Sequence, residues 1–283
     1  MTQWLLEFDK VYYTYPASSI PALNELTLRL PAGKKSVLLG YNGCGKSTLL
    51  YLADGLYKPQ RGIIRWQGKP IKYDRRSLAK LREQVGLVFQ DPEQQLVAAT
   101  VEEDISYGLC NLGLPAAEIE QRVAQALADF DLQEVATRPI HHLSLGQKKR
   151  VALAGVTVLQ PQLLLLDEPT AYLDPLQVRQ LIANLQTIHA NGTTLLMATH
   201  DLDLAYQWAD WIFVMHQGKV ILEGSAATVF SQRTILEDLQ FGLPLIWEVW
   251  AALPSELRSQ FGECPPPKTI DELRRLLFLL NNP

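Results

Sequence analysis

The N-terminal part of the chain alternates apolar and polar positions. The alternation covers 5–8, 11–15 and 26–30, and a further short run at 63–66 leads into the turn residues of 67–69. Alternation with a period of two is typical of strands that bury one face, and a Gly-containing turn between two such runs favours a hairpin. These segments therefore predict antiparallel strands at the start of the chain, followed by a hairpin.

Four later runs are mainly apolar, at 37–39, 85–89, 163–166 and 194–199. A strand that is apolar on both faces is covered on both faces, as in a parallel sheet with helices on either side. We therefore expect an α/β fold with a parallel core sheet, closed by a hairpin over 212–222. Gln90, Asp167 and His200 follow three of these runs directly. The carboxyl ends of such strands are where open α/β sheets carry their chemistry.

Helical periodicity replaces the strand patterns between 101 and about 136. There, apolar residues recur on one helical face. This face comprises Ile119, Val123, Ala126, Leu127 and Phe130. We assign about 95–160 to a helical insert in the sheet domain.

The region 231–283 is expected to be a C-terminal helical extension. Gly and Pro residues divide it into helical segments, and the stretch 269–272 predicts the cap of a final helix. Trp247 and Trp250 belong to an apolar surface of this region. That surface either packs on the main domain or serves self-association, and the sequence leaves both alternatives open.

Residues 40–47 match the pattern G-x-x-x-x-G-K-[ST], between the apolar run 37–39 and a helix-like stretch at 48–53. Three glycines allow the backbone to fold around an anion with its N–H groups pointing inward, and the helix N-terminus adds partial positive charge. A nucleoside di- or triphosphate is the natural occupant. Lys46 would reach its β and γ phosphates, and the Ser47 hydroxyl would hold Mg²⁺. The alternative is a Gly-rich turn, which needs neither the Lys nor the Ser.

Ionisable side chains follow two other core strands. Asp167 and Glu168 end the run 163–166, and buried acids at that edge need a partner such as phosphate-bound Mg²⁺. We assign Asp167 to the metal, mainly through water, and Glu168 to orienting or deprotonating an attacking water. His200 follows the run 194–199, where it would donate to a γ-phosphate. The alternatives are an exposed acidic turn and a structural His.

A second helix N-terminus is predicted at Ser144, because Ser144 and Gln147 have the S-x-x-Q spacing of a capping box. This helix end is either a plain cap or a second anion site. If it is an anion site, the phosphate loop of the same chain need not be able to reach it. His141 and His142 precede this helix. Since no third ligand stands at useful spacing, we expect a solvated loop there and no metal site.

Composition excludes several classes of protein. The 283 residues have a formal net charge of -4, so there is no basic footprint for nucleic acid. Cys44, Cys110 and Cys264 are widely spaced, which favours a reducing, cytoplasmic setting over a disulfide framework. No stretch approaches the ~18 apolar residues of a membrane span. A role at a membrane would therefore require another chain to supply the spanning helices.

These motifs, in this order, resemble ATP-binding-cassette (ABC) ATPases over residues 4–230. The shared features are the phosphate loop, Gln90, the Leu-Ser-Leu-Gly-Gln signature at 143–147, the acidic strand end and His200. The resemblance implies an ABC nucleotide-binding domain at 1–230, followed by the extension at 231–283.

The resemblance also implies site residues. Tyr15 would stack on adenine, and 171–174 would be a dimer-contact loop. Gln90 would touch Mg²⁺ and transmit motion to a membrane partner. The catalytic residues that we expect are Glu168, His200 and Gln90, and the metal ligands are Ser47, Gln90 and Asp167. The expected ATP contacts are Tyr15, Gly40, Tyr41, Asn42, Gly43, Cys44, Gly45, Lys46, Ser47, Thr48, Ser144, Gly146 and Gln147.

Two residues depart from the family pattern. Leu145 stands where the family usually has Gly, and Tyr172 where it usually has a small residue. Because only backbone N–H groups would serve the phosphate here, the Leu145 side chain is expected to point away from it, while Gly146 keeps the close approach. A Leu145 side chain that intruded would impair hydrolysis.

The stretches 89–95 and 147–151, together with the extension, look like the ATPases of energy-coupling-factor transporters, and 66–70 and 111–113 resemble their cobalt-importing branch. The resemblance implies Mg²⁺-dependent ATP hydrolysis coupled to uptake of a transition-metal ion, cobalt first, with nickel or a vitamin such as biotin as alternatives. It implies a homodimer at the cytoplasmic face of the inner membrane, bound to an integral coupling subunit and a substrate-binding membrane subunit.

Two rival classes remain. One is a non-transport ABC ATPase of DNA maintenance or translation, although 48–142 holds only a short helical insert and the chain has one cassette. The other is a small-molecule kinase, in which the signature at 143–147 would have no purpose. Phosphate release without an acceptor distinguishes the kinase.

Overall fold

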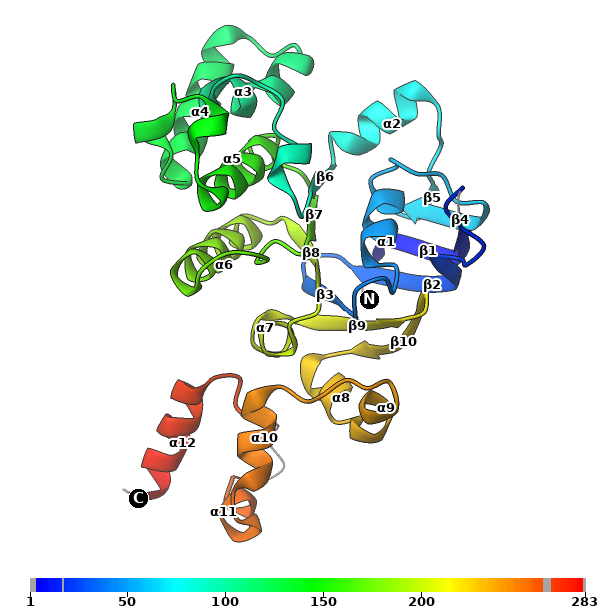
Figure 1. Ribbon diagram of the computed structural model, residues 1–283, viewed down its shortest axis with the longest axis vertical. Helices are drawn as coiled ribbons and strands as arrows, with labels where there is room; N and C mark the ends of the chain where they lie inside the picture. Colours follow the sequence, from blue (N-terminus) through cyan, green and yellow to red (C-terminus); the bar gives the residue numbers. More distant parts are fainter. Residues whose placement is uncertain (1–3, 17, 262–265, 282–283) are drawn as a thin grey trace.

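Two β-sheets form the framework of the computed structural model, which describes residues 4–16, 18–261 and 266–281 (Figure 1). The smaller sheet contains β1 (Trp4–Tyr13), β2 (Leu23–Pro31), β4 (Arg61–Trp66) and β5 (Lys69–Pro70). Its strand order is β2-β1-β4-β5, and all its pairs are antiparallel. The predicted antiparallel strands and the hairpin at 63–69 are confirmed.

The prediction of two strands at 5–8 and 11–15 is wrong, because β1 is continuous. Lys10 has a φ of 50°, and the register of β1 against β2 shifts between Phe8 and Val11. A bulge places one extra residue in a strand and disturbs its in-out alternation. The hydrophobic pattern therefore breaks at Lys10 although the strand goes on.

The larger sheet is the core of the molecule. Its strands are β3 (Lys35–Leu39), β6 (Val85–Val88), β7 (Leu163–Asp167), β8 (Thr194–Thr199), β9 (Trp211–His216) and β10 (Lys219–Gly224). The order is β10-β9-β3-β8-β7-β6, with parallel pairing throughout except between β9 and the edge strand β10. The predicted parallel core sheet and closing hairpin are confirmed. Because the strands run in parallel, the chain that follows β3, β7 and β8 emerges at one edge of the sheet.

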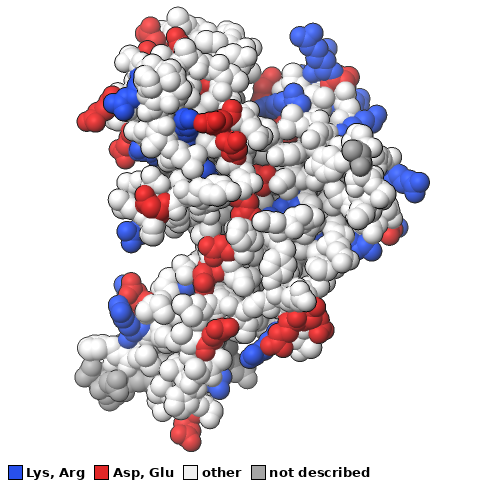
Figure 2. Space-filling model, viewed as in Figure 1, with Lys and Arg blue, Asp and Glu red and all other residues white. Residues whose placement is uncertain are grey.

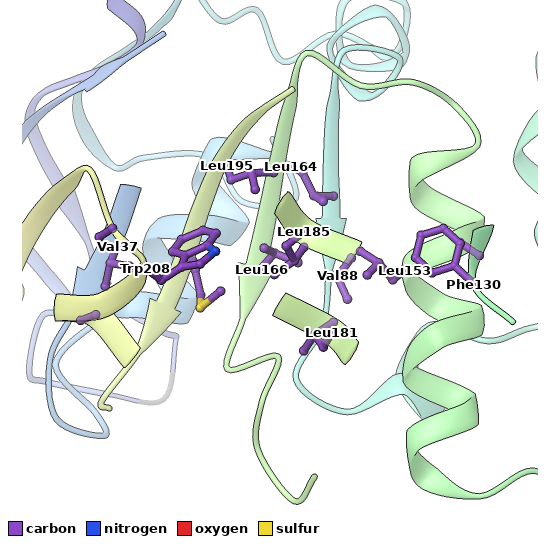
Figure 3. Packing of buried hydrophobic residues seen from close by; sticks show 14 of the residues in the cluster. Val37, Val88, Phe130, Leu153, Leu164, Leu166, Leu181, Leu185, Leu195 and Trp208 are labelled. Atoms are coloured by element: carbon purple, nitrogen blue, oxygen red, sulfur yellow. The ribbon is translucent and has the colours of Figure 1, made fainter. Parts of the chain in front are cut away.

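Successive residues of the core strands serve two different hydrophobic clusters. On β7, Leu164 and Leu166 belong to one cluster, whereas Leu163 and Leu165 belong to the other. Figure 3 shows the first cluster, in which strand residues pack against Leu181 and Leu185 of a covering helix. Both faces of the sheet are buried, which is why the core runs are mainly apolar.

In the described part of the chain before residue 225, seven α-helices accompany the two sheets. They are α1 (Lys46–Ala53), α2 (Arg75–Arg82), α3 (Val101–Asn111), α4 (Ala116–Asp129), α5 (Leu145–Thr157), α6 (Pro175–Ala190) and α7 (Leu202–Trp208). Helices α3, α4 and α5 pack on one another as a separate group at one end of the molecule (Figure 1). The predicted apolar face of α4 is turned inward, since Val123, Ala126 and Leu127 are buried.

The C-terminal region is helical, as predicted. Its elements are α8 (Ala226–Phe230), α9 (Arg233–Asp238), α10 (Leu245–Ala252), α11 (Ser255–Ser259) and α12 (Ile270–Asn281). Ile246 and Trp250 of α10 are buried, and the Trp247 ring lies 6.0 Å from that of Tyr206 in α7. Leu245 and Phe278 are 59% and 66% exposed. One face of the extension therefore packs on the main body, while other apolar side chains lie on its surface.

Charged side chains of both signs are spread over the face shown in Figure 2. Among the described residues, no helix combines the length and apolarity that crossing a membrane requires. Cys44 and Cys110 are free thiols, and Cys264 lies outside the described residues.

Candidate active site

The phosphate loop occupies the turn between β3 and α1, as predicted. Gly43 and Gly45 have φ values of 81° and 107°, a region that side chains rarely adopt. A Cβ atom on Gly45 would lie 2.4 Å from the carbonyl oxygen of Ala22. Glycine is thus required at Gly45 both for the backbone conformation and for the close approach to Ala22. The first N–H groups of α1 have no side-chain cap, which leaves them for an anion.

Lys46 lies at the start of α1 with its ammonium group turned back along the loop. Its Nζ atom is 2.6 Å from the carbonyl oxygen of Gly40, 3.3 Å from that of Tyr41 and 3.2 Å from Oε1 of Glu168. Lys46 and Glu168 are both buried, so their ion pair is shielded from solvent. The predicted phosphate-binding and catalytic side chains are in direct contact.

Glu168 follows the last residue of β7 and adopts a φ of 43°. Its backbone N–H donates to the carbonyl oxygen of Ala198 in β8 at 3.0 Å. Nδ1 of His200, which follows β8, lies 3.1 Å from both carboxylate oxygens. The parallel sheet therefore brings Glu168 and His200 together, and the carboxylate lies between an ammonium and an imidazole.

Asp167 is the last residue of β7 and is 1% exposed. Burial raises the pKa of its carboxyl group, and the Ser47 hydroxyl opposes that shift. Its Oδ1 atom is buried without a hydrogen-bond partner. A buried acceptor of this kind next to a hydroxyl fits a divalent cation with oxygen ligands. Ser47 and Asp167 thus fit the predicted Mg²⁺ site.

A cavity of about 420 Å³ opens in front of the phosphate loop. Several predicted site residues line it: Tyr15, Asn42, Gly43, Gly45, Lys46, Ser47, Thr48, Gln90 and Glu168. The Tyr15 hydroxyl lies 3.0 Å from Oγ1 of Thr48, and its ring meets those of Tyr13 and Tyr57 edge to face. Tyr15, which follows β1, and Gln90, which follows β6, therefore lie beside the phosphate loop. We call residues 40–48, Asp167, Glu168 and His200 the phosphate-loop side.

The predicted second anion site lies elsewhere, at the start of α5. The capping box is present: Ser144 Oγ accepts from the N–H of Gln147, and Gln147 Oε1 accepts from the N–H of Ser144. Residues 143–147 are absent from the lining of the cavity at the phosphate loop, as far as the described residues show. The chain therefore does not bring its own signature to its own phosphate loop. We call residues 143–147 together with Tyr172 the signature end.

The two departures from the family pattern are both on the surface. Leu145 is 37% exposed and Tyr172 is 83% exposed, with a φ of 63° at Tyr172. Gly146 is buried, and a Cβ atom there would lie 2.4 Å from Nε2 of Gln177. Gln177 lies in the first turn of α6, so the signature end is packed against the helix that follows 171–174.

Two residues near the site were not singled out from the sequence. Lys149 of α5 is buried, and its ammonium donates to the carbonyl oxygens of Pro169 and Ala171 at 3.0 and 2.8 Å. Burial lowers the pKa of Lys149 to about 8, against the opposing effect of Glu168. The Tyr51 hydroxyl faces Asp167, and burial raises the pKa of Tyr51 to about 12. The sequence did contain a signal for Lys149, because a lysine on the apolar face of a helix indicates a buried charge. No feature of the sequence indicated a role for Tyr51.

His141 and His142 are exposed in a short 3-10 turn, Ile140–His142. Among the described residues there is no group of three His, Cys, Asp or Glu side chains that could hold a metal ion. The exposed turn agrees with the predicted solvated loop.

The chain matches known proteins along most of its length. A family model described as ABC transporter covers residues 23–171. A putative ABC transporter ATP-binding protein of Nostoc sp. is 63% identical over 250 residues, which is 88% of this chain and 91% of that protein. An energy-coupling factor transporter ATP-binding protein, EcfA2 of Clostridium perfringens, is 41% identical over 98% of this chain and 99% of that protein.

Solved structures agree with these matches. CbiO1 from Clostridium perfringens, described as part of the ABC transporter complex CbiONQ, has a TM-score of 0.74 at 40% identity, covering 84% of this chain and 95% of that one. The ATP-binding cassette MJ0796, solved as a dimer in a post-hydrolysis state with ADP and Pi, has a TM-score of 0.72 at 27% identity, covering 78% and 99%. The resemblance stated from the motifs is confirmed: the chain belongs to the ABC transporter family of ATP-hydrolysing proteins, on the branch that includes the energy-coupling-factor ATPases.

Proposed function

We propose that this ATPase couples hydrolysis to the uptake of a transition-metal ion, cobalt first, as the energy-supplying subunit of an importer. The observation that carries the proposal is the contact of Lys46, Glu168 and His200 beside a phosphate loop at one edge of the core sheet. The family membership and the similarity to CbiO1 support it. The choice of cobalt depends further on the resemblance of 66–70 and 111–113 to the cobalt-importing branch.

In the proposed mechanism the phosphate loop and Lys46 bind the β and γ phosphates of ATP. Mg²⁺, held by Ser47, Gln90 and Asp167, would supply charge neutralisation on the phosphates. A bound γ-phosphate competes with Glu168 for the Lys46 ammonium, which frees the carboxylate to orient a water and accept its proton. His200 donates to the γ-phosphate and stabilises the charge that develops on it.

We further propose that two copies pair head to tail, each bringing its signature end to the phosphate loop of the other. The separation of the signature end from the cavity supports this arrangement, because a second chain would be needed to bring a signature end to that cavity. The dimeric cassette among the similar structures supports it too. Donors from Ser144 and Gly146 of one copy would then meet the γ-phosphate bound by the other. Hydrolysis removes the shared anion and lets the copies separate.

The membrane partners are part of the same proposal. Gln90, exposed beside the cavity, would transmit the closure to an integral coupling subunit, next to a substrate-binding membrane subunit. The ATPase would then lie at the cytoplasmic face of the inner membrane. We keep 1–230 as the nucleotide-binding domain, with the insert at about 95–160, and 231–283 as the extension.

Purification from membranes followed by reconstitution tests the proposal. We expect membrane proteins to copurify with the chain, and vesicles in which the ATPase of the complex faces the lumen to take up radiolabelled cobalt only when ATP is enclosed in that lumen. The complex carrying Glu168→Gln should take up none. Uptake of nickel or labelled biotin would identify the alternative cargo. ATP hydrolysis without associated membrane proteins or uptake would indicate a non-transport ATPase and contradict the proposal.

A further inference from the structure

The C-terminal extension touches the phosphate loop. The ring of Phe241, which follows α9, is stacked on the ring of Tyr41, with centroids 4.6 Å apart and an angle of 10° between the planes. The Tyr41 hydroxyl donates to the carbonyl oxygen of Gln240. Tyr41 is the second residue of the phosphate loop, so two residues far along the chain hold one of its side chains.

The backbone of Tyr41 also contacts two other residues of the phosphate loop. Its carbonyl oxygen accepts from the N–H of Cys44 at 3.2 Å and from Nζ of Lys46 at 3.3 Å. The side chain itself is 47% exposed, so the loop alone does not bury it. The stack on Phe241 therefore restrains the first half of a loop whose N–H groups must point at the phosphates.

Phe241 is firmly held on its own side. It is 3% exposed, and its N–H donates to the carbonyl oxygen of Leu236 in α9 at 2.7 Å. Gln240, with a φ of 62°, makes the left-handed turn that ends α9. The stack thus connects the phosphate loop to a buried part of the extension and not to a free side chain.

The same stretch, residues 240–245, also contacts α7, the helix that follows His200. The N–H of Leu245 donates to Oδ1 of Asp203 at 2.7 Å, in the first turn of α7. That helix begins directly after His200 and Asp201. Residues 240–245 therefore run from the phosphate loop to the helix that follows the predicted γ-phosphate donor.

We propose that residues 240–245 are a positioning element of the nucleotide site, in which the Phe241 stack on Tyr41 preorganises the phosphate loop. Preorganisation increases affinity by lowering the ordering cost of binding. Loss of the stack should therefore weaken the binding of ADP as well as ATP, because the loop holds phosphates that both contain. The effect on the rate at saturating ATP should be smaller, since Glu168 and His200 stay in place.

A double-mutant cycle on ADP affinity tests this inference, which rests on nucleotide binding at the phosphate loop. Phe241→Leu keeps an apolar side chain but removes the ring, and we expect the Kd for ADP to rise about five-fold, the order of one aromatic pair. In a Tyr41→Leu background the same change should have no further effect on Kd. Trp250→Leu, which removes a buried ring of the extension that packs on Phe261, is the matched control and should leave Kd unchanged.

An unchanged Kd in folded Phe241→Leu, or the same rise in both backgrounds, would overturn the inference. Binding and stability are coupled in both directions. In the wild-type chain, ADP should therefore slow hydrogen exchange of the amides of 240–245, which needs no variant. Exchange that ADP leaves unaltered would also overturn it. A wild-type chain that bound no ADP would instead refute the nucleotide site itself.

Discussion

The phosphate-loop side and the signature end are both built at helix N-termini, but their surroundings differ. On the phosphate-loop side, Lys46, Asp167 and Glu168 are buried, and the helix N-terminus has no side-chain cap. At the signature end, Ser144 and Gln147 satisfy each other's N–H groups, while Leu145 and Tyr172 lie on the surface. The phosphate-loop side is a buried, charged site within one chain. The signature end is a surface whose cap N–H groups are already hydrogen-bonded.

This difference agrees with the proposed pairing of two copies. Buried charges that contact one another are costly unless a ligand or partner group completes them, so the phosphate-loop side is suited to binding phosphate and metal. A capped and exposed helix end is stable by itself and suited to docking. Changes on the phosphate-loop side should therefore affect nucleotide binding by one chain, whereas changes at the signature end should affect hydrolysis only when two chains meet.

The largest effect is expected for Glu168→Gln. Glutamine keeps the shape of the side chain but cannot take a proton from water, so phosphate release should fall by about 100-fold or more. Nucleotide binding and pairing should persist, because the phosphate loop and the signature end are intact. Lys46→Ala, in contrast, should lose ATP affinity as well. Phosphate release, ATP titration and gel filtration measure these properties, and wild-type turnover in Glu168→Gln would contradict the assignment of the base.

Ser144→Ala is expected to reduce hydrolysis by about 10-fold to 100-fold, since it removes a donor that would act on the γ-phosphate of the other copy. ATP binding by single chains should not change. Loss of the cap also costs about 1 kcal/mol. Ser225 caps α8 in a similar way, because its side chain also accepts from the N–H of the third residue of its helix. Ser225→Ala should therefore lose similar stability and keep its hydrolysis. Equal hydrolysis by Ser144→Ala and the wild-type chain would show that the composite site is wrong.

Patterns local in sequence predicted one part of this arrangement and missed another. The continuous apolar run at 163–166 predicted a doubly covered strand, and the glycine spacing at 40–47 predicted the phosphate loop, because both depend on neighbouring residues. The capping box at Ser144 is local too. The stack of Tyr41 on Phe241 and the contact of Lys46 with Glu168 depend on strand order and on where distant segments cross. No period or motif in the sequence encodes them.

The far end of α1, the helix that follows the phosphate loop, should also respond to pH. Burial raises the pKa of Asp54, just after α1, from 3.8 to about 7, against the lowering effect of Arg82. Because the folded chain holds this proton more tightly than the unfolded chain, stability falls as pH rises between about 4 and 7. Asp54→Asn removes that dependence.

We expect Asp54→Asn to unfold at pH 8 with a free energy above that of the wild type by up to about 4 kcal/mol, because each pKa unit is worth about 1.4 kcal/mol and the net rise to about 7 already includes the lowering effect of Arg82. The difference should shrink toward pH 4. Urea unfolding at both pH values measures it. Glu83→Gln changes an exposed carboxylate nearby and should show neither effect. A stability gain in Asp54→Asn that did not vary with pH would contradict the burial argument.

The smallest effect is expected for Leu145→Gly, which restores the usual residue of the family at the signature end. Leu145 is the first residue of α5, and its side chain is on the surface. The donors at this helix end are backbone N–H groups and the Ser144 hydroxyl, which the change leaves in place. Hydrolysis should therefore change by less than about three-fold, as for most surface substitutions. If Leu145→Gly instead accelerated phosphate release ten-fold, the leucine would obstruct the facing nucleotide, and the signature end would be an incomplete docking surface in this chain.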